Sequence, residues 1–281
     1  MNNIETLLHG SIDMHAHYGP DAVVPRKLDA LMGAQLAREA GMRAIVLKCH
    51  HYCTAPLADM VSQAVPNIAV FGSICLNAEV GGLNPAVVEA AARQGAKVIW
   101  MPTNGSTWDY MHAAPKPTGI SILSKTEKWL SSVSNILATA KKHDMIVATG
   151  HLQVHEVFIL VEEALAQGLT KFVVTHPLGW KVDSYFTLEQ MRRIADMGAF
   201  VEYCFVTTLP KGGLTVKEMA DSIKAVGAER CVLSTDLGQA DNPAPVDGMR
   251  MMIAAMLDNG LSEKEIEVMI KTNPAKLLGM D

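Results

Sequence analysis

Short apolar runs recur along the chain, and each is followed by a longer stretch of mixed apolar and polar positions. The runs are rich in Val, Ile, Leu and Ala and show little alternation, which is typical of strands buried on both faces. The predicted strands are Ile12–His17, Ala44–Lys48, Ile68–Leu76, Lys97–Met101, Met145–Thr149, Lys171–Thr175, Ala199–Phe205 and Cys231–Thr235.

The stretches between these runs carry the start and stop signals of helices. Asn84-Pro85 predicts an N-cap followed by a proline in the first helical position. Three capping boxes pair Thr187 with Gln190, Thr215 with Glu218, and Ser262 with Glu265. Glycines follow the ends of four predicted helices, at Gly41, Gly95, Gly168 and Gly198.

The alternation of strand and helix in units of roughly thirty residues predicts right-handed βαβ units and a parallel sheet. Eight units in 281 residues predict a single (β/α)8 TIM barrel over 1–281, without an added β-sandwich domain. The alternative is an open, doubly wound sheet. It is the weaker expectation, because no glycine fingerprint follows the first strand.

Composition narrows the class of protein. The chain is 49% hydrophobic and 19% charged, which excludes a disordered chain and allows a sizeable core. A net charge of −5 without a basic stripe gives no reason to expect nucleic acid. We expect no membrane span and no signal peptide, since the first residues lack a basic segment. Five scattered cysteines without a C-x-x-C pair indicate a reduced, cytoplasmic protein, and a homo-oligomer stays open.

The sequence Asp13-Met14-His15-Ala16-His17 ends the first predicted strand. Side chains alternate along a strand, so His15 and His17 are predicted to point the same way, into the mouth of the barrel. Two imidazoles at that spacing can bind one divalent ion, and Asp13 is expected on the same face as a supporting partner. Taken alone, the pair could equally be hydrogen-bonded structural histidines.

Three further ligand-type residues follow apolar strands. His151 follows the fifth, His176 the sixth and Asp236 the eighth. Each could separately be a satisfied histidine or an N-cap aspartate. Together, at the strand ends where barrels deliver catalytic groups, they predict a metal site.

This ordered set resembles the amidohydrolase superfamily of metal-dependent TIM-barrel hydrolases, in an uncharacterised subgroup made of the barrel alone. The resemblance rests on H-x-H at the first strand, single histidines at the fifth and sixth, and an aspartate at the eighth. It extends to the C-terminal segment Asn273–Gly279. It implies metal ligands at His15, His17, His151, His176 and Asp236, with Asp236 also moving protons in catalysis.

The chain departs from the family pattern at the fourth strand. Relatives with two metals often carry a bridging carbamylated lysine or a glutamate there, whereas this strand ends Trp100-Met101-Pro102-Thr103. Lys48, at the end of the second strand, is a candidate bridging and catalytic group. Alternatively, Lys48 stays cationic and pairs with Glu202 or with an anionic substrate.

Substrate-binding candidates come from two places. His50 shares a face with Lys48, and Glu202 lies in an otherwise apolar strand, where an unpaired carboxylate would be costly. A structural salt bridge is the alternative for Glu202. The long connection from Pro102 to Thr126, with Trp108, Tyr110 and His112, is predicted to be a substrate lid or else a surface insertion.

The predicted activity is hydrolysis of a C–N or C–O bond (amide, cyclic amide, lactone or ester) in a small polar substrate by a metal-activated water. One or two divalent ions are expected, Zn²⁺ first, with Mn²⁺ or Fe²⁺ as alternatives. Three alternatives stay open. They are a one-metal decarboxylase of the same superfamily, a TatD-like or other phosphoester hydrolase, and a metal-binding barrel that senses a ligand without catalysis.

Overall fold

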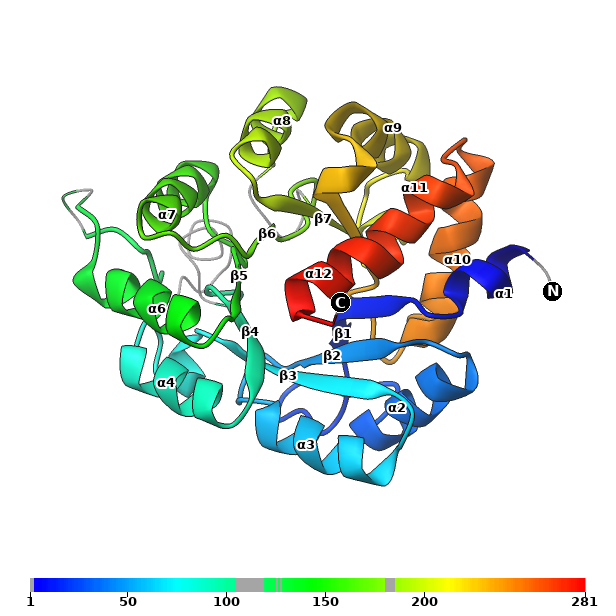
Figure 1. The fold of residues 1–281 in the computed structure, drawn as a ribbon, viewed down its shortest axis with the longest axis horizontal. Helices are drawn as coiled ribbons and strands as arrows, with labels where there is room; N and C mark the ends of the chain where they lie inside the picture. Colours follow the sequence, from blue (N-terminus) through cyan, green and yellow to red (C-terminus); the bar gives the residue numbers. More distant parts are fainter. Residues whose placement is uncertain (1–2, 105–118, 125, 127, 180–184, 281) are drawn as a thin grey trace.

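Eight parallel strands alternate with helices around a common axis in the computed structural model, which describes residues 3–104, 119–124, 126, 128–179 and 185–280 (Figure 1). The strands follow one another around the sheet in chain order. They are β1 (Ile12–His17), β2 (Ala44–Lys48), β3 (Ala69–Cys75), β4 (Ala96–Trp100), β5 (Ile146–Ala148), β6 (Phe172–Val174), β7 (Phe200–Cys204) and β8 (Cys231–Ser234). All eight predicted strands are confirmed; β1 and β2 have the predicted ends, and the ends of the others are shifted by at most one residue.

The ring of strands closes where β8 returns to β1. The backbone N–H of Asp236 donates to the carbonyl of His15 at 2.7 Å, and that of His17 donates to the carbonyl of Leu237 at 2.7 Å. Ala16 and Leu237 form a parallel bridge at the same point. The fold is therefore a (β/α)8 TIM barrel, as predicted, and not an open sheet.

The helices surround the strands (Figure 1), and the four helix starts that the sequence predicted are confirmed. Asn84 caps α4, and the three predicted capping boxes form at the starts of α8, α9 and α11. The helices are α1 (Asn3–Leu8), α2 (Ala30–Glu39), α3 (Ala55–Ala64), α4 (Pro85–Arg93), α6 (Ser131–Lys142), α7 (Val154–Ala166), α8 (Leu188–Asp196), α9 (Val216–Val226), α10 (Pro245–Asp258), α11 (Glu263–Glu267) and α12 (Asn273–Leu278).

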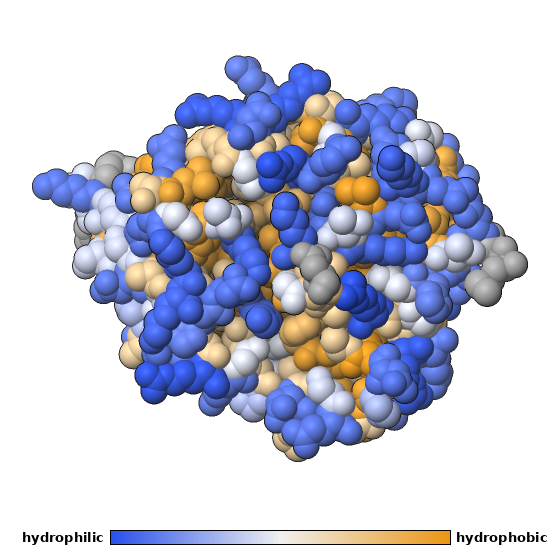
Figure 2. Space-filling view, viewed as in Figure 1, coloured by the Kyte–Doolittle hydropathy of each residue, from blue (hydrophilic) through white to orange (hydrophobic). Residues whose placement is uncertain are grey.

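Two apolar clusters form the core. The larger lies between the strands and the surrounding helices. The smaller fills the barrel around Ile12, Val46, Val98 and Phe200, and it includes Leu277 of α12. Figure 1 shows α12 across the near end of the barrel, and Figure 2 shows the surface of the same face, where polar side chains surround scattered apolar ones. The amino ends of the strands are thus plugged, and the carboxyl ends remain for chemistry.

No helix in the described part of the chain has both the length and the apolar composition needed to cross a bilayer.

Candidate metal centre at the barrel mouth

β1 and the segment after β8 bring three potential ligand atoms together. Oδ1 of Asp236 lies 3.0 Å from Nε2 of His15 and 3.0 Å from Nε2 of His17. One nitrogen or oxygen atom from each residue lies within 4.8 Å of the other two. Two imidazoles and a carboxylate form a donor set that divalent transition metals accept, zinc among them.

The backbone at this site is held in an uncommon conformation. Asp236 has φ +51° and His176 has φ +25°, in the left-handed region that side chains other than glycine seldom occupy. Gly238 follows with φ +135°, and a Cβ there would lie 1.8 Å from the carbonyl of His17. The segment after β8 therefore packs directly on the end of β1, which places the Asp236 carboxylate against both histidines.

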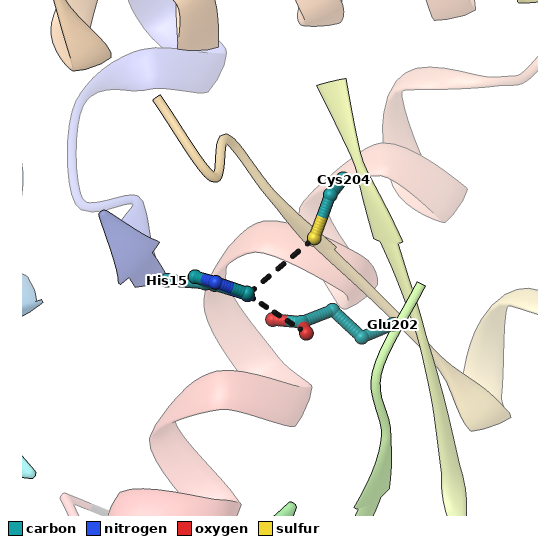
Figure 3. Close-up of side chains that lie close together, drawn as sticks. All are labelled: His15, Glu202 and Cys204. Carbon is teal, nitrogen blue, oxygen red and sulfur yellow. Dashed lines mark hydrogen bonds and ion pairs between the residues drawn. The ribbon is translucent and has the colours of Figure 1, made fainter. Parts of the chain in front are cut away.

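The opposite ring nitrogen of His15 faces β7. Nδ1 of His15 lies 3.1 Å from Oε2 of Glu202 and 3.6 Å from Sγ of Cys204 (Figure 3). Glu202 and Cys204 are two residues apart, so both point inward from the same strand, and both are buried. A carboxylate on the far nitrogen of a ligating histidine orients the ring and strengthens its basicity.

Lys48 forms the floor of the site. Its Nζ lies 2.7 Å from Nε2 of His15 and 4.4 Å from the centre of the Trp100 ring, and its side chain is buried. Among the described residues no ion pair joins Lys48 to Glu202, because Glu202 contacts His15 instead. Trp100 stands at the end of β4, where its indole packs against Lys48 and His15.

The remaining predicted histidines line the same mouth. Nε2 of His176 lies 3.6 Å from Oδ2 of Asp236, and the ring centres of His151 and His176 are 5.4 Å apart. The ring of His50 stacks on that of His17, with centres 4.9 Å apart. His151 is not one of the three residues whose ligand atoms lie within 4.8 Å of one another, and its ring contacts that of His176.

Burial and the two carboxylates set the charges of the histidines. Burial alone would lower the pKa of His15, but Asp236 and Glu202 raise it above the usual value. Burial lowers the pKa of His17 to about 3, and it also holds the pKa of His176 well below the usual range. His50 likewise has a lowered pKa, chiefly through burial. His17, His50 and His176 are therefore neutral near pH 7. A metal ligand must be neutral, so a cation at the site would have to displace the proton that the carboxylates favour on His15.

The carboxylate of Asp236 stays ionised. Burial opposes its charge, but His15 and His17 hold its pKa well below the usual value. Burial raises the pKa of Asp13 to about 6, against hydrogen bonds from Thr235 and from the backbone of His15.

Asp13 does not support the histidine rings as the alternation of side chains predicted. Its carboxylate accepts the hydroxyl of Thr235 at 2.5 Å and the backbone N–H groups of Thr235 and His15. The pairing of β1 with β2 shifts register between Asp13 and Ala16, which breaks the period of two. Asp13 therefore fixes the segment that carries Asp236 rather than the ring of a ligand.

Comparison with known proteins identifies the family to which the chain belongs. A family of unknown function, DUF6282, matches residues 10–202. The chain belongs to this family. No curated protein matches it.

Solved structures share the fold of this DUF6282 member. An amidohydrolase and a probable dipeptidase, both from Pseudomonas aeruginosa, are each 13% identical, with a TM-score of 0.69. Each alignment covers 99% of this chain, and 98% and 97% of the two structures. A 2,6-dihydroxybenzoate decarboxylase from Rhizobium is 12% identical, with a TM-score of 0.60, over 97% of this chain and 99% of that one. The predicted resemblance to the amidohydrolase superfamily is confirmed as a shared fold.

Sequence reasoning missed several residues of this DUF6282 site. Cys204 could have been found from its spacing to Glu202, since both lie on one face of β7. Asn77 and Thr103, which contact His50, carry no recognisable signal because they come from two separate strand ends. Glu156 forms a capping box with Gln153 at the start of α7. Trp108, Tyr110 and His112 of the predicted lid lie outside the described residues.

Proposed function

We propose that this protein is a metal-dependent hydrolase that cleaves a C–N or C–O bond in a small polar substrate. The observation that carries the proposal is the convergence of His15, His17 and Asp236 at the carboxyl end of the barrel, within 4.8 Å of one another. In a TIM barrel this is the end where active sites are built.

The contacts of His15 support a cation at this point. Asp236 and Glu202 raise the pKa of His15, so the two carboxylates favour a positive charge on or beside this ring. When the ring is neutral and its Nδ1–H donates to Glu202, Nε2 carries a lone pair, which faces the Asp236 carboxylate oxygen at 3.0 Å. Two electron-rich atoms at that distance repel each other unless a positive charge lies beside them. The ammonium of Lys48 supplies that charge in the structure, and a divalent ion bound by His15, His17 and Asp236 would supply it equally. Zn²⁺ is our first choice, with Mn²⁺ and Fe²⁺ as alternatives.

The ion would supply Lewis-acid chemistry, lowering the pKa of a water and polarising the scissile carbonyl. The side chains around it have distinct tasks. Asp236, kept ionised, takes the proton of the attacking water and returns it to the leaving group. Its second oxygen faces His176 at 3.6 Å, so His176 and its neighbour His151 orient the oxygen of the substrate or bind a second ion.

Lys48 has one of two tasks in this proposal. In a site with two ions, Lys48 would be a carbamate that holds both of them. In a site with one ion it stays a cation and binds an anionic group of the substrate. Its Nζ is already within 2.7 Å of the His15 nitrogen, so either task acts on the same atoms.

A decarboxylase is the second candidate. It is favoured by the buried ammonium of Lys48 at the floor of the mouth, where a substrate carboxylate could pair with it. The shared fold with 2,6-dihydroxybenzoate decarboxylase is compatible with both candidates.

The test combines metal analysis with a substrate panel. Protein is stripped with a chelator, reloaded separately with Zn²⁺, Mn²⁺ or Fe²⁺, and assayed on amides, cyclic amides, lactones, esters and phosphoesters, with CO₂ release followed on aromatic carboxylates. Metal-dependent turnover of an amide, lactone or ester supports the proposal. Release of CO₂ alone supports the decarboxylase, and phosphoester turnover alone a phosphoester hydrolase. Bound metal without turnover of any substrate in the panel contradicts all three proposed activities.

A further inference from the structure

A buried polar chain holds the ring of His50 at the mouth, and the proposed metal centre makes no use of it. Nδ1 of His50 lies 2.7 Å from the hydroxyl oxygen of Thr103. Thr103 and Asn77 are both fully buried, whereas His50 is partly exposed. The chain therefore runs from the interior of the barrel wall out to a partly exposed ring.

Asn77 anchors this chain with both ends of its amide. Its Nδ2 donates to the carbonyl of His50 at 2.9 Å and to the hydroxyl of Thr103 at 3.0 Å. Its Oδ1 accepts the backbone N–H of Thr103 at 2.7 Å and that of Asn104 at 3.0 Å. One side chain after β3 thus fixes the segments after β2 and β4, and with them the position of His50.

These contacts decide where the hydroxyl proton of Thr103 lies. The hydroxyl oxygen accepts a hydrogen bond from Nδ2 of Asn77. Its proton has three acceptors within reach: Oδ1 of Asn77 at 3.3 Å, which already accepts two backbone N–H groups, the sulfur of the buried Cys75, which is a weak acceptor, and Nδ1 of His50. The hydroxyl proton is best placed toward Nδ1 of His50 at 2.7 Å. An accepting Nδ1 carries no proton, so the neutral ring of His50 carries its proton on Nε2.

The Nε2 edge of His50 is the one left for a substrate. Within the part of the chain that the structure describes, no hydrogen bond is made to His50 Nε2. The ring stacks on that of His17 with an angle of 27° between the planes, and Nε2 of His17 lies 3.0 Å from Oδ1 of Asp236. A neutral N–H donor fixed next to a metal centre can stabilise negative charge that develops on a substrate oxygen.

We propose that His50 is a substrate-binding donor, which presents Nε2–H to a carbonyl or carboxylate oxygen of the substrate, and that Thr103 and Asn77 are its positioning residues. The donor role rests on the proposed function. The tautomer does not, because it follows from the hydrogen bonds of the protein alone.

The tautomer is measured first, in the absence of substrate. Long-range ¹H–¹⁵N spectra of the ¹⁵N-labelled full-length protein distinguish a protonated Nε2 from a protonated Nδ1, with His50→Asn assigning the signals. We expect protonated Nε2 in the wild type and in Thr103→Ser, and a mixture of tautomers in Thr103→Val. A protonated Nδ1 in the wild type, or an unchanged spectrum in Thr103→Val, overturns the positioning chain whether or not the protein is a hydrolase.

Kinetics on the substrate that the panel identifies test the donor role. Thr103→Val should lower kcat about tenfold or more with a smaller change in KM, and Thr103→Ser should restore most of it. Thr207→Val is the matched control, since it removes another buried threonine hydroxyl, one that donates to the carbonyl of Cys204 at 2.7 Å. An equal loss of kcat in Thr207→Val, or no loss in Thr103→Val, contradicts the donor role.

Discussion

The two ends of the barrel interior are built from the same strands and differ in almost every other respect. At the amino ends, Ile12, Val46 and Phe200 pack with Leu277 of α12 in an apolar plug. At the carboxyl ends, the same three strands present His15, Lys48 and Glu202, all buried. A few residues along each strand thus separate the part that stabilises the barrel from the part that holds charge in a low-dielectric site.

The comparison teaches that the charges at the mouth depend on one another. The ring of His15, for example, contacts Glu202 through Nδ1 and both Lys48 and Asp236 through Nε2. Removing one buried partner leaves another uncompensated, whereas each apolar side chain in the plug contributes by area and shape. Substitutions at the two ends should therefore separate function from stability.

Asp236→Asn should have the largest effect, at the mouth. It keeps the shape and one oxygen but cannot accept the proton of a water, so kcat should fall by about 10²–10⁴. Metal content, measured by mass spectrometry of the purified protein, should fall much less. Turnover of Asp236→Asn at the wild-type rate would show that Asp236 does not transfer the proton of the water.

Leu277→Ala tests the plug. Leu277 is buried under the barrel, and its truncation should reduce the free energy of unfolding by about 2–5 kcal/mol. Metal affinity and kcat per folded molecule should not change. Urea unfolding measures the loss, and Met251→Ala, on the exposed side of α10, is the matched control. A lowered metal affinity in Leu277→Ala would show that the two ends are not separate.

Glu202→Gln tests whether the negative charge beside His15 contributes to metal binding at the mouth. It retains an oxygen for the Nδ1–H of His15 but removes the charge, so metal affinity should fall about 10–100-fold. Competition with a chelator measures the affinity. Glu156→Gln is the control, because Glu156 is equally buried yet binds Ser121 and the backbone N–H of Ile122. Equal losses in both variants would point to a general effect of buried charge.

Thr215→Ala should have the smallest effect, outside both ends. It removes the side chain that caps α9 through the N–H of Glu218 and should cost about 1 kcal/mol of unfolding free energy. Thermal unfolding checks this, and turnover should match the wild type. Thr215→Ser keeps the cap and should unfold like the wild type. A loss of turnover in Thr215→Ala would show that the stability of α9 affects catalysis.

Residues governed by local rules could be predicted from the sequence. Lys48 and Glu202 were predicted as site residues because they are charged groups in or at the end of apolar strands, and both are buried in the structure. Capping chemistry correctly predicted the starts of α4, α8, α9 and α11. Asp13 was misplaced because β1 changes register before His15, a feature with no local sequence mark. The chain from Asn77 through Thr103 to His50 depends on three strand ends meeting in space, which no spacing along the chain encodes.

The most direct test of the account is the position of a bound ion. A crystal of the zinc-loaded protein, measured with X-rays at the zinc absorption edge, gives an anomalous signal wherever zinc is held. The account predicts a peak bonded to Nε2 of His15, Nε2 of His17 and a carboxylate oxygen of Asp236. A peak elsewhere with these three residues unbound, or no peak in protein saturated with zinc, would contradict it.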